Sequence, residues 1–137
     1  MNRLHLTGAL LSTATVLATA PAALAQSADQ NYISDLYNFL GSQDELAYVV
    51  AAEYIGADMN VYLAQSFCQA YREGVSPADA FSYFTTYAIS EAANSGYALG
   101  DAEAYTLGLY AGSVMNLGAA YYCPEYSAQV EQALNAM

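Results

Sequence analysis

Basic residues are almost missing from this 137-residue chain, which has no lysine and only two arginines, Arg3 and Arg72. Its one histidine, His5, lies at the amino terminus. Residues 26–137 therefore lack the commonest general base and the commonest metal ligand. With a single arginine they also have little positive charge to neutralise phosphates, which disfavours nucleic-acid binding.

Several motifs are absent too. The two cysteines do not form a Cys-x-x-Cys motif, which disfavours a redox pair, and no histidine is present to complete a zinc site with them. Asp58-x-Asn60 is only a fragment of the calcium loop of an EF-hand, and an N-cap explains it better. No β-branched run has strand length, so no glycine-rich phosphate loop can follow a strand. We expect no metal or cofactor from these patterns.

The first 25 residues have the layout of a cleaved export signal. A cationic MNR start precedes a short apolar core, and Ala23-Leu24-Ala25 is a small-x-small cleavage pattern. The alternative is a retained anchor, but the apolar core is short for a membrane span. We therefore predict a signal peptide at 1–25, a single helical domain at 26–137, a secreted or periplasmic location, and no stable membrane insertion after cleavage.

Acidic residues dominate the charge of the predicted mature chain. It has thirteen aspartates and glutamates against Arg72, a side-chain charge of −12. An acidic, solvated surface keeps an exported protein soluble, which is the simpler interpretation. Attraction of cations or basic partners is the alternative.

Apolar residues recur at intervals of three and four, which predicts an all-α fold, a small bundle of four to six helices. The expected helices cover about 29–40, 43–55, 58–73, 78–93 and 101–122, with a short helix opening at Pro124. Residues 43–55 and 58–73 could instead form one helix kinked at Gly56.

Local signals mark several helix ends. Gly41 is expected to stop the first helix, and Ser42 with Glu45 to form a capping box for the second. Asp58 is a candidate N-cap for the third. Ser76 is the clearest N-cap, because Pro77 suits the first helical position and Asp79 faces the positive end of the helix dipole.

The segment 101–122 is apolar on most sides and has no charge between Glu103 and Glu125. Such a helix lies in the centre of a bundle or in a membrane. Gly108 and Gly112 form a G-x-x-x-G pattern. No basic residue flanks the run, so we favour a central helix whose glycines allow close approach of its neighbours.

Cys68 and Cys123, 55 positions apart, are expected to form one disulfide in an exported protein. A bond closing a loop of this length stabilises the fold by roughly 4 kcal/mol in the chain-entropy model. A nucleophilic cysteine is disfavoured because residues 26–137 offer no histidine or lysine as its base.

Fourteen tyrosines are the compositional feature with functional potential, because tyrosine combines contact area with a polar tip. Some fall on apolar stripes and are expected to fill the core: Tyr32, Tyr54, Tyr62, Tyr83 and Tyr87. Others lie near helix ends and could line a shared binding surface: Tyr97, Tyr121, Tyr122 and Tyr126.

Phe39-Leu40, Cys68 with Gly74 six residues later, and Tyr122-Cys123-Pro124 resemble motifs of the small exported domains of unknown function that abound in mycobacteria. The similarity covers about residues 30–124. It implies a helical fold closed by one cysteine pair after a signal peptide, and no activity. The thirteen residues after Pro124, the tyrosine content and the wide cysteine spacing depart from that family.

We therefore expect a binding or structural module that interacts with an unknown protein or a cell surface. One alternative is a small-molecule carrier with an apolar, tyrosine-lined pocket between the third, fourth and fifth helices. The other is a small extracellular hydrolase with carboxylates drawn from different helices. No two acids lie three or four apart, so no single helix presents a carboxylate pair, and no catalytic residue is assigned.

Overall fold

The computed structural model describes residues 27–137, so the predicted signal peptide at 1–25 lies outside the described residues. Contacts divide the chain into two units, residues 1–31 and 32–137. The described part of the first unit, 27–31, is helical. The extent of the domain from residue 26 stays a prediction.

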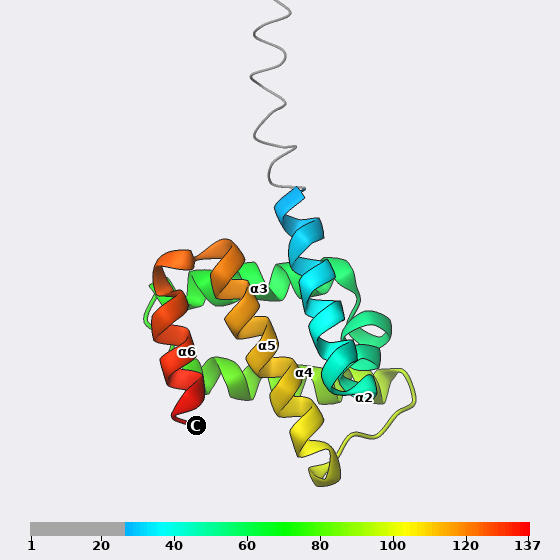
Figure 1. The fold of residues 1–137 in the computed structure, drawn as a ribbon. Helices are drawn as coiled ribbons and strands as arrows, with labels where there is room; N and C mark the ends of the chain where they lie inside the picture. Colours follow the sequence, from blue (N-terminus) through cyan, green and yellow to red (C-terminus); the bar gives the residue numbers. More distant parts are fainter. Residues whose placement is uncertain (1–26) are drawn as a thin grey trace, which may run out of the picture. The chain divides into compact units, whose positions relative to one another are not determined.

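The second unit is built of helices, and no strand occurs in residues 27–137, which confirms the all-α prediction. A helix over residues 32–43 precedes the remaining elements, of which Figure 1 labels the α-helices. The remaining elements are α2 (Glu45–Val49), the π-helix η1 (Val50–Ile55), α3 (Ala57–Arg72), α4 (Pro77–Asn94), the 3₁₀-helix η2 (Asp101–Glu103), α5 (Ala104–Tyr122), the 3₁₀-helix η3 (Pro124–Tyr126) and α6 (Ser127–Asn135).

The apolar helix α5 is the centre of the unit, as its sequence predicts. Its buried residues include Leu107, Tyr110, Val114 and Met115, and it packs against both α3 and α4. Figure 1 shows α5 passing between α6 and the helix at 32–43. Within residues 27–137, none of the helices combines the length and apolar character needed to cross a bilayer.

Gly56 separates two helices, which settles the question that the sequence left open. Its φ of 93° lies in the left-handed region that favours glycine, and α3 begins directly after it. The prediction that Asp58 caps this helix is wrong, because the N-cap position is Gly56. The chain before Gly56 forms η1, and the sequence did not predict this π-helical turn.

The first helix boundary also differs from the prediction. Helix continues through Gly41 to residue 43, and the Ser42 hydroxyl donates to the Phe39 carbonyl (2.7 Å) instead of capping. Asp44 is the N-cap of α2, since its Oδ1 accepts from the Leu46 amide at 2.9 Å. Its Oδ2 accepts from the Thr106 hydroxyl (2.6 Å), which ties the start of α2 to α5.

Asn60 holds the break at Gly56 in place from inside the core. Its fully buried side chain donates to the carbonyls of Ala51 and Gly56, each at 2.8 Å, and accepts from the Tyr110 hydroxyl at 2.7 Å. The Tyr32 hydroxyl donates to the Asn60 carbonyl at 3.3 Å. Burial raises the pKa of both tyrosines well above the ordinary value, so they remain neutral donors.

The turn between α3 and α4 follows the sequence prediction. Gly74 has a φ of 95°, and Ser76 caps α4 by accepting from the Asp79 amide at 3.1 Å. Pro77 occupies the first turn, where its missing N–H costs nothing. The two helices are therefore connected by a tight, well-capped turn.

Close approach between helices occurs at a different glycine from the predicted pair. A Cβ added at Gly118 would lie 3.0 Å from the Ala64 Cβ of α3. At Gly112 the nearest atom would be 4.0 Å away, and at Gly108 it would be 3.6 Å away. The G-x-x-x-G pair therefore does not mark the tightest contact, and Gly118 does.

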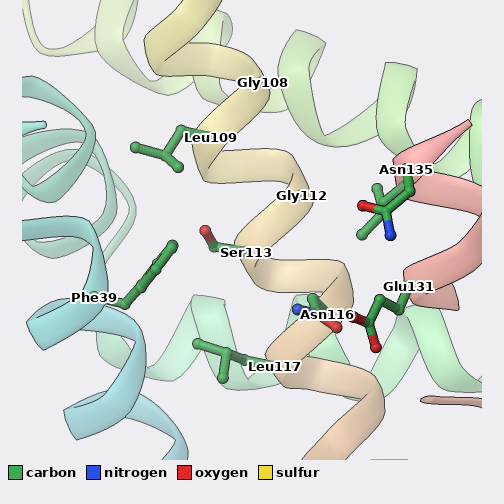
Figure 2. A pocket seen from close by; sticks show the side chains of 10 residues that line it. Phe39, Gly108, Leu109, Gly112, Ser113, Asn116, Leu117, Glu131 and Asn135 are labelled. Atoms are coloured by element: carbon green, nitrogen blue, oxygen red, sulfur yellow. The ribbon is translucent and has the colours of Figure 1, made fainter. Parts of the chain in front are cut away.

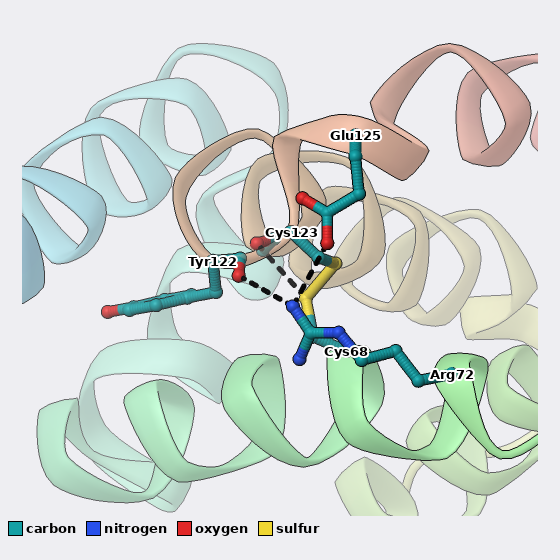
Figure 3. Close-up of a disulfide and its surroundings, with 6 residues drawn as sticks. Cys68, Arg72, Tyr122, Cys123 and Glu125 are labelled. Carbon is teal, nitrogen blue, oxygen red and sulfur yellow. Dashed lines mark hydrogen bonds and ion pairs between the residues drawn. A yellow bond between two sulfur atoms is a disulfide. The ribbon is translucent and has the colours of Figure 1, made fainter.

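The predicted disulfide joins Cys68 of α3 to Cys123 at the end of α5, with Cα atoms 5.8 Å apart. Both residues are buried. Figure 3 shows Arg72 reaching over this bond towards Glu125, with Nη2 3.1 Å from Oε1, and towards the Tyr122 carbonyl at 3.5 Å. The pKa of Glu125 is lowered by a backbone hydrogen bond and by Arg72.

Candidate functional site

An apolar groove lies between α3 and α4, with a volume of about 310 Å³. Its floor contains buried rings and a buried leucine, namely Leu63, Phe67 and Phe84. The rest of the lining comes from both helices and the turn between them: Tyr62, Ser66, Ala70, Val75, Asp79, Ala80 and Tyr83. Helical spacing explains this set, because positions three and four apart share one face of a helix.

Two tyrosines of the groove are largely uncovered. Tyr62 of α3 is 62% exposed and Tyr83 of α4 is 58% exposed, and Val75 in the turn is 40% exposed. The apolar stripes of the sequence predict that Tyr62 and Tyr83 lie in the core, and that prediction is wrong. Their stripe does face the neighbouring helix, but only the residues beside them, Leu63 and Phe84, reach the interior.

Aromatic rings continue from the groove along both helices. Tyr83 stacks with Tyr87 at a centroid distance of 6.3 Å, and Phe84 meets Phe67 edge-on at 6.2 Å. Phe67 in turn contacts Tyr71 at 6.0 Å. Burial, followed by the charge of Glu91, raises the pKa of Tyr87 above its ordinary value. The groove is therefore part of a wider aromatic surface of α3 and α4.

The only charged side chain lining this groove is acidic. Asp79 lies in the first turn of α4, and no lysine or arginine contributes to the lining. Asp58, four residues before Tyr62, and Glu73, three after Ala70, lie in register with the α3 side of the groove. Both are exposed, so the surroundings of the groove are negative.

A second hollow, also of about 310 Å³, lies along α5 between α6 and the helix at 32–43 (Figure 2). Phe39 points towards α5 in this view and is 45% exposed. Gly108 and Gly112 leave part of its α5 wall without side chains, and Asn116, Glu131 and Asn135 add polar groups. This hollow has one exposed aromatic ring, whereas the α3–α4 groove has two.

Three of the four tyrosines expected near helix ends, Tyr121, Tyr122 and Tyr126, lie at the carboxyl end of α5 or just after it, whereas Tyr97 precedes α5. Tyr97 contacts Tyr54 at 6.1 Å, near the start of α5. Tyr121 and Tyr122 meet Tyr32 at 6.0 and 5.4 Å at the other end of α5, and Tyr126 contacts Tyr71 at 4.8 Å. Tyr121 also donates to Asp35, which raises the pKa of Tyr121. A binding role for this set stays a prediction.

Neither of these two hollows brings together the pair of carboxylates that a hydrolase of this type would need. Each hollow has a single acidic lining residue, Asp79 in one and Glu131 in the other. A glycosidase needs two carboxylates across one cleft. In residues 27–137, histidine, cysteine and acidic side chains form no group of three that could hold a metal ion.

No family model, curated protein or solved structure matches this chain. The resemblance to small exported mycobacterial domains therefore stays a prediction. The sequence predicts a tyrosine-lined pocket between the third, fourth and fifth helices only as an alternative, because the signal of the α3–α4 groove is shared between two helices. The spacing of Tyr62 and Ser66 on one helix, with Asp79 and Tyr83 on the next, becomes visible only once the two helices are paired.

Proposed function

We propose that this chain is an exported binding module that engages a protein partner at the groove between α3 and α4. The observation that carries the proposal is the pair of exposed rings, Tyr62 and Tyr83, beside an apolar floor. Tyrosine is enriched among the residues that dominate interface energetics, and apolar patches left open on small proteins mark interaction sites.

Two observations support export. The leader-like residues 1–25 precede the described helices, and the Cys68–Cys123 disulfide is of the kind that persists in oxidising compartments. Mass spectrometry of the exported protein is expected to give a chain that begins at Gln26 with both cysteines bridged. A chain that retains residues 1–25, or two free thiols, would contradict this part of the proposal.

The binding test uses fluorescently labelled, refolded protein on the surface of the cells that export it. We expect the double substitution Tyr62→Ser and Tyr83→Ser to weaken binding about tenfold or more, since two anchor rings are lost. Tyr105→Ser is the matched control, because Tyr105 is 65% exposed and does not line the groove. Equal binding by all three proteins would reject the groove as the site.

A small-molecule carrier is the second candidate, supported by the volume of the groove. About 310 Å³ lies at the lower end of the range of ligand pockets. Its location between α3 and α4 matches two of the three helices expected for a carrier. Native mass spectrometry of protein purified from its own host distinguishes the two, because a carrier retains a small ligand that the double tyrosine variant loses.

A further inference from the structure

Resting on the proposed function, we propose that the α3–α4 groove recognises a basic segment of the partner protein. A lysine or arginine side chain is held by the tyrosine rings and Asp79, and a neighbouring apolar side chain lies on the floor of the groove. This assigns a chemical class to the partner, which the proposed function alone leaves open.

The lining of the groove has the chemistry that recognises organic cations. An ammonium or guanidinium group is attracted to the face of a tyrosine ring, and a carboxylate nearby adds a charge-assisted hydrogen bond. Tyr62, Tyr83 and Asp79 supply both kinds of group in one groove, and all three are exposed. Within residues 27–137, Asp79 forms no ion pair, since the one that occurs joins Arg72 to Glu125.

Charge complementarity favours a basic partner over a neutral or an acidic one. The predicted mature chain carries a side-chain charge of −12, and its single cation, Arg72, is already engaged by Glu125. Asp58 and Glu73 extend the negative field along α3 on either side of the groove residues. Such a field speeds association with basic segments and repels acidic ones.

The apolar floor explains why a basic residue alone would not suffice. Leu63, Phe67 and Phe84 are at most 3% exposed and present hydrocarbon to the groove. The aliphatic stem of lysine or arginine can cover part of it while the charge stays at the rim. An adjacent leucine-like side chain would cover the remainder, so the expected motif combines both.

Four synthetic peptides test directly whether the groove recognises a basic segment with an adjacent apolar side chain. The probe is acetyl-Gly-Leu-Arg-Leu-Arg-Gly-amide, and three analogues replace both arginines by glutamine, both arginines by glutamate, or both leucines by serine. Binding is measured by calorimetry and by the shifts of the tyrosine ring protons at physiological ionic strength. The parent peptide is expected to bind tightest, with each of the three analogues weaker by about fivefold or more.

Variants of the full chain separate local recognition from general attraction by charge. Asp79→Asn is expected to weaken binding of the parent peptide about three- to fivefold, and Tyr62→Ser with Tyr83→Ser about tenfold. The controls are Asp101→Asn and Tyr105→Ser, which remove the same groups from positions outside the groove. Both are expected to change the affinity less than about twofold, because Tyr105 does not line the groove and the exposed charge of Asp101, also outside it, is screened by salt.

The outcomes distinguish this inference from the proposed function. If the glutamine peptide binds as tightly as the arginine peptide, cation recognition is refuted while the groove remains a binding site. If Asp101→Asn weakens binding as much as Asp79→Asn, the attraction is diffuse and the inference fails. If no peptide binds, the inference also fails, and the cell-surface comparison of the tyrosine variants decides the proposed function separately.

Discussion

Two parallel stripes of α3 have opposite characters. Asn60, Ala64 and Cys68, spaced four apart, face α5 and are at most 1% exposed. Tyr62 and Ser66, also four apart, face the groove beside α4, and Tyr62 is more than half exposed. One helix therefore presents a closed, bonded surface on one side and an open, aromatic surface on the other.

The difference lies in what each stripe bonds to. The buried stripe is fixed to α5 by a hydrogen bond from Tyr110, by close contact at Gly118 and by the disulfide to Cys123. The open stripe has no such bonds, and the Tyr62 ring, which is 62% exposed, contributes little to closing the core. Stability is therefore concentrated on the α5 side of α3, which leaves the α4 side free to bind. Substitutions on the α5 side of α3 should therefore lower the free energy of unfolding more than substitutions on the α4 side.

The largest expected effect comes from the disulfide at Cys68, the last residue of the buried stripe. Replacing both cysteines by alanine opens a loop of 55 residues and should lower the free energy of unfolding by about 4 kcal/mol. Urea unfolding followed by circular dichroism measures it. Reduction of the wild-type protein should give the same loss, and an unchanged midpoint in either experiment would refute a stabilising role for this bond.

The closed side of α3 could be predicted from the sequence only in part. Two cysteines in an exported chain indicate a disulfide, and that prediction is confirmed. Asn60 was interpreted as part of an N-cap, whereas it is buried and hydrogen-bonded. The spacing of asparagine, alanine and cysteine at intervals of four was the available signal, because small and polar residues on one stripe mark a close, bonded helix contact.

The open side was predicted incorrectly, and the reason is physical. Periodicity indicates which residues share a face, but not how deep each lies when a neighbouring helix covers only part of that face. Tyr32 and Tyr83 both fall on apolar stripes, yet Tyr32 is fully buried and Tyr83 is 58% exposed. Phe39 is a similar case, since it is apolar and adjoins the fully buried Leu40 in the sequence, yet it is 45% exposed.

A smaller but still large effect is expected at Asn60. Asn60→Ala removes two donors to the Ala51 and Gly56 carbonyls and leaves the Tyr110 hydroxyl without its acceptor. Burying unpaired polar groups should cost about 2–3 kcal/mol in unfolding free energy. Asn116→Ala is the matched control on α5, because Asn116 is exposed. A loss no greater than that of Asn116→Ala would show that the network does not stabilise the break at Gly56.

The smallest expected effects are those of replacing two glycines of α5 by alanine. The change in the free energy of unfolding should have opposite signs at Gly112 and Gly118. Alanine forms helix better than glycine by roughly 1 kcal/mol, so Gly112→Ala, whose new methyl meets only Leu134 at 4.0 Å, should be stabilising by part of that amount. Gly118→Ala places the same methyl 3.0 Å from the Ala64 Cβ and 3.4 Å from its Cα, so α3 and α5 must separate. Overpacking typically costs about 1–3 kcal/mol, which outweighs the gain in helix propensity.

The separation of α3 and α5 would also strain the neighbouring disulfide contact, so the loss should be larger in the oxidised protein than in the double cysteine variant. Stabilisation by both substitutions would mean that the contact at Gly118 relaxes freely, so that the disulfide and the hydrogen bond from Tyr110 to Asn60 hold α3 against α5 without it.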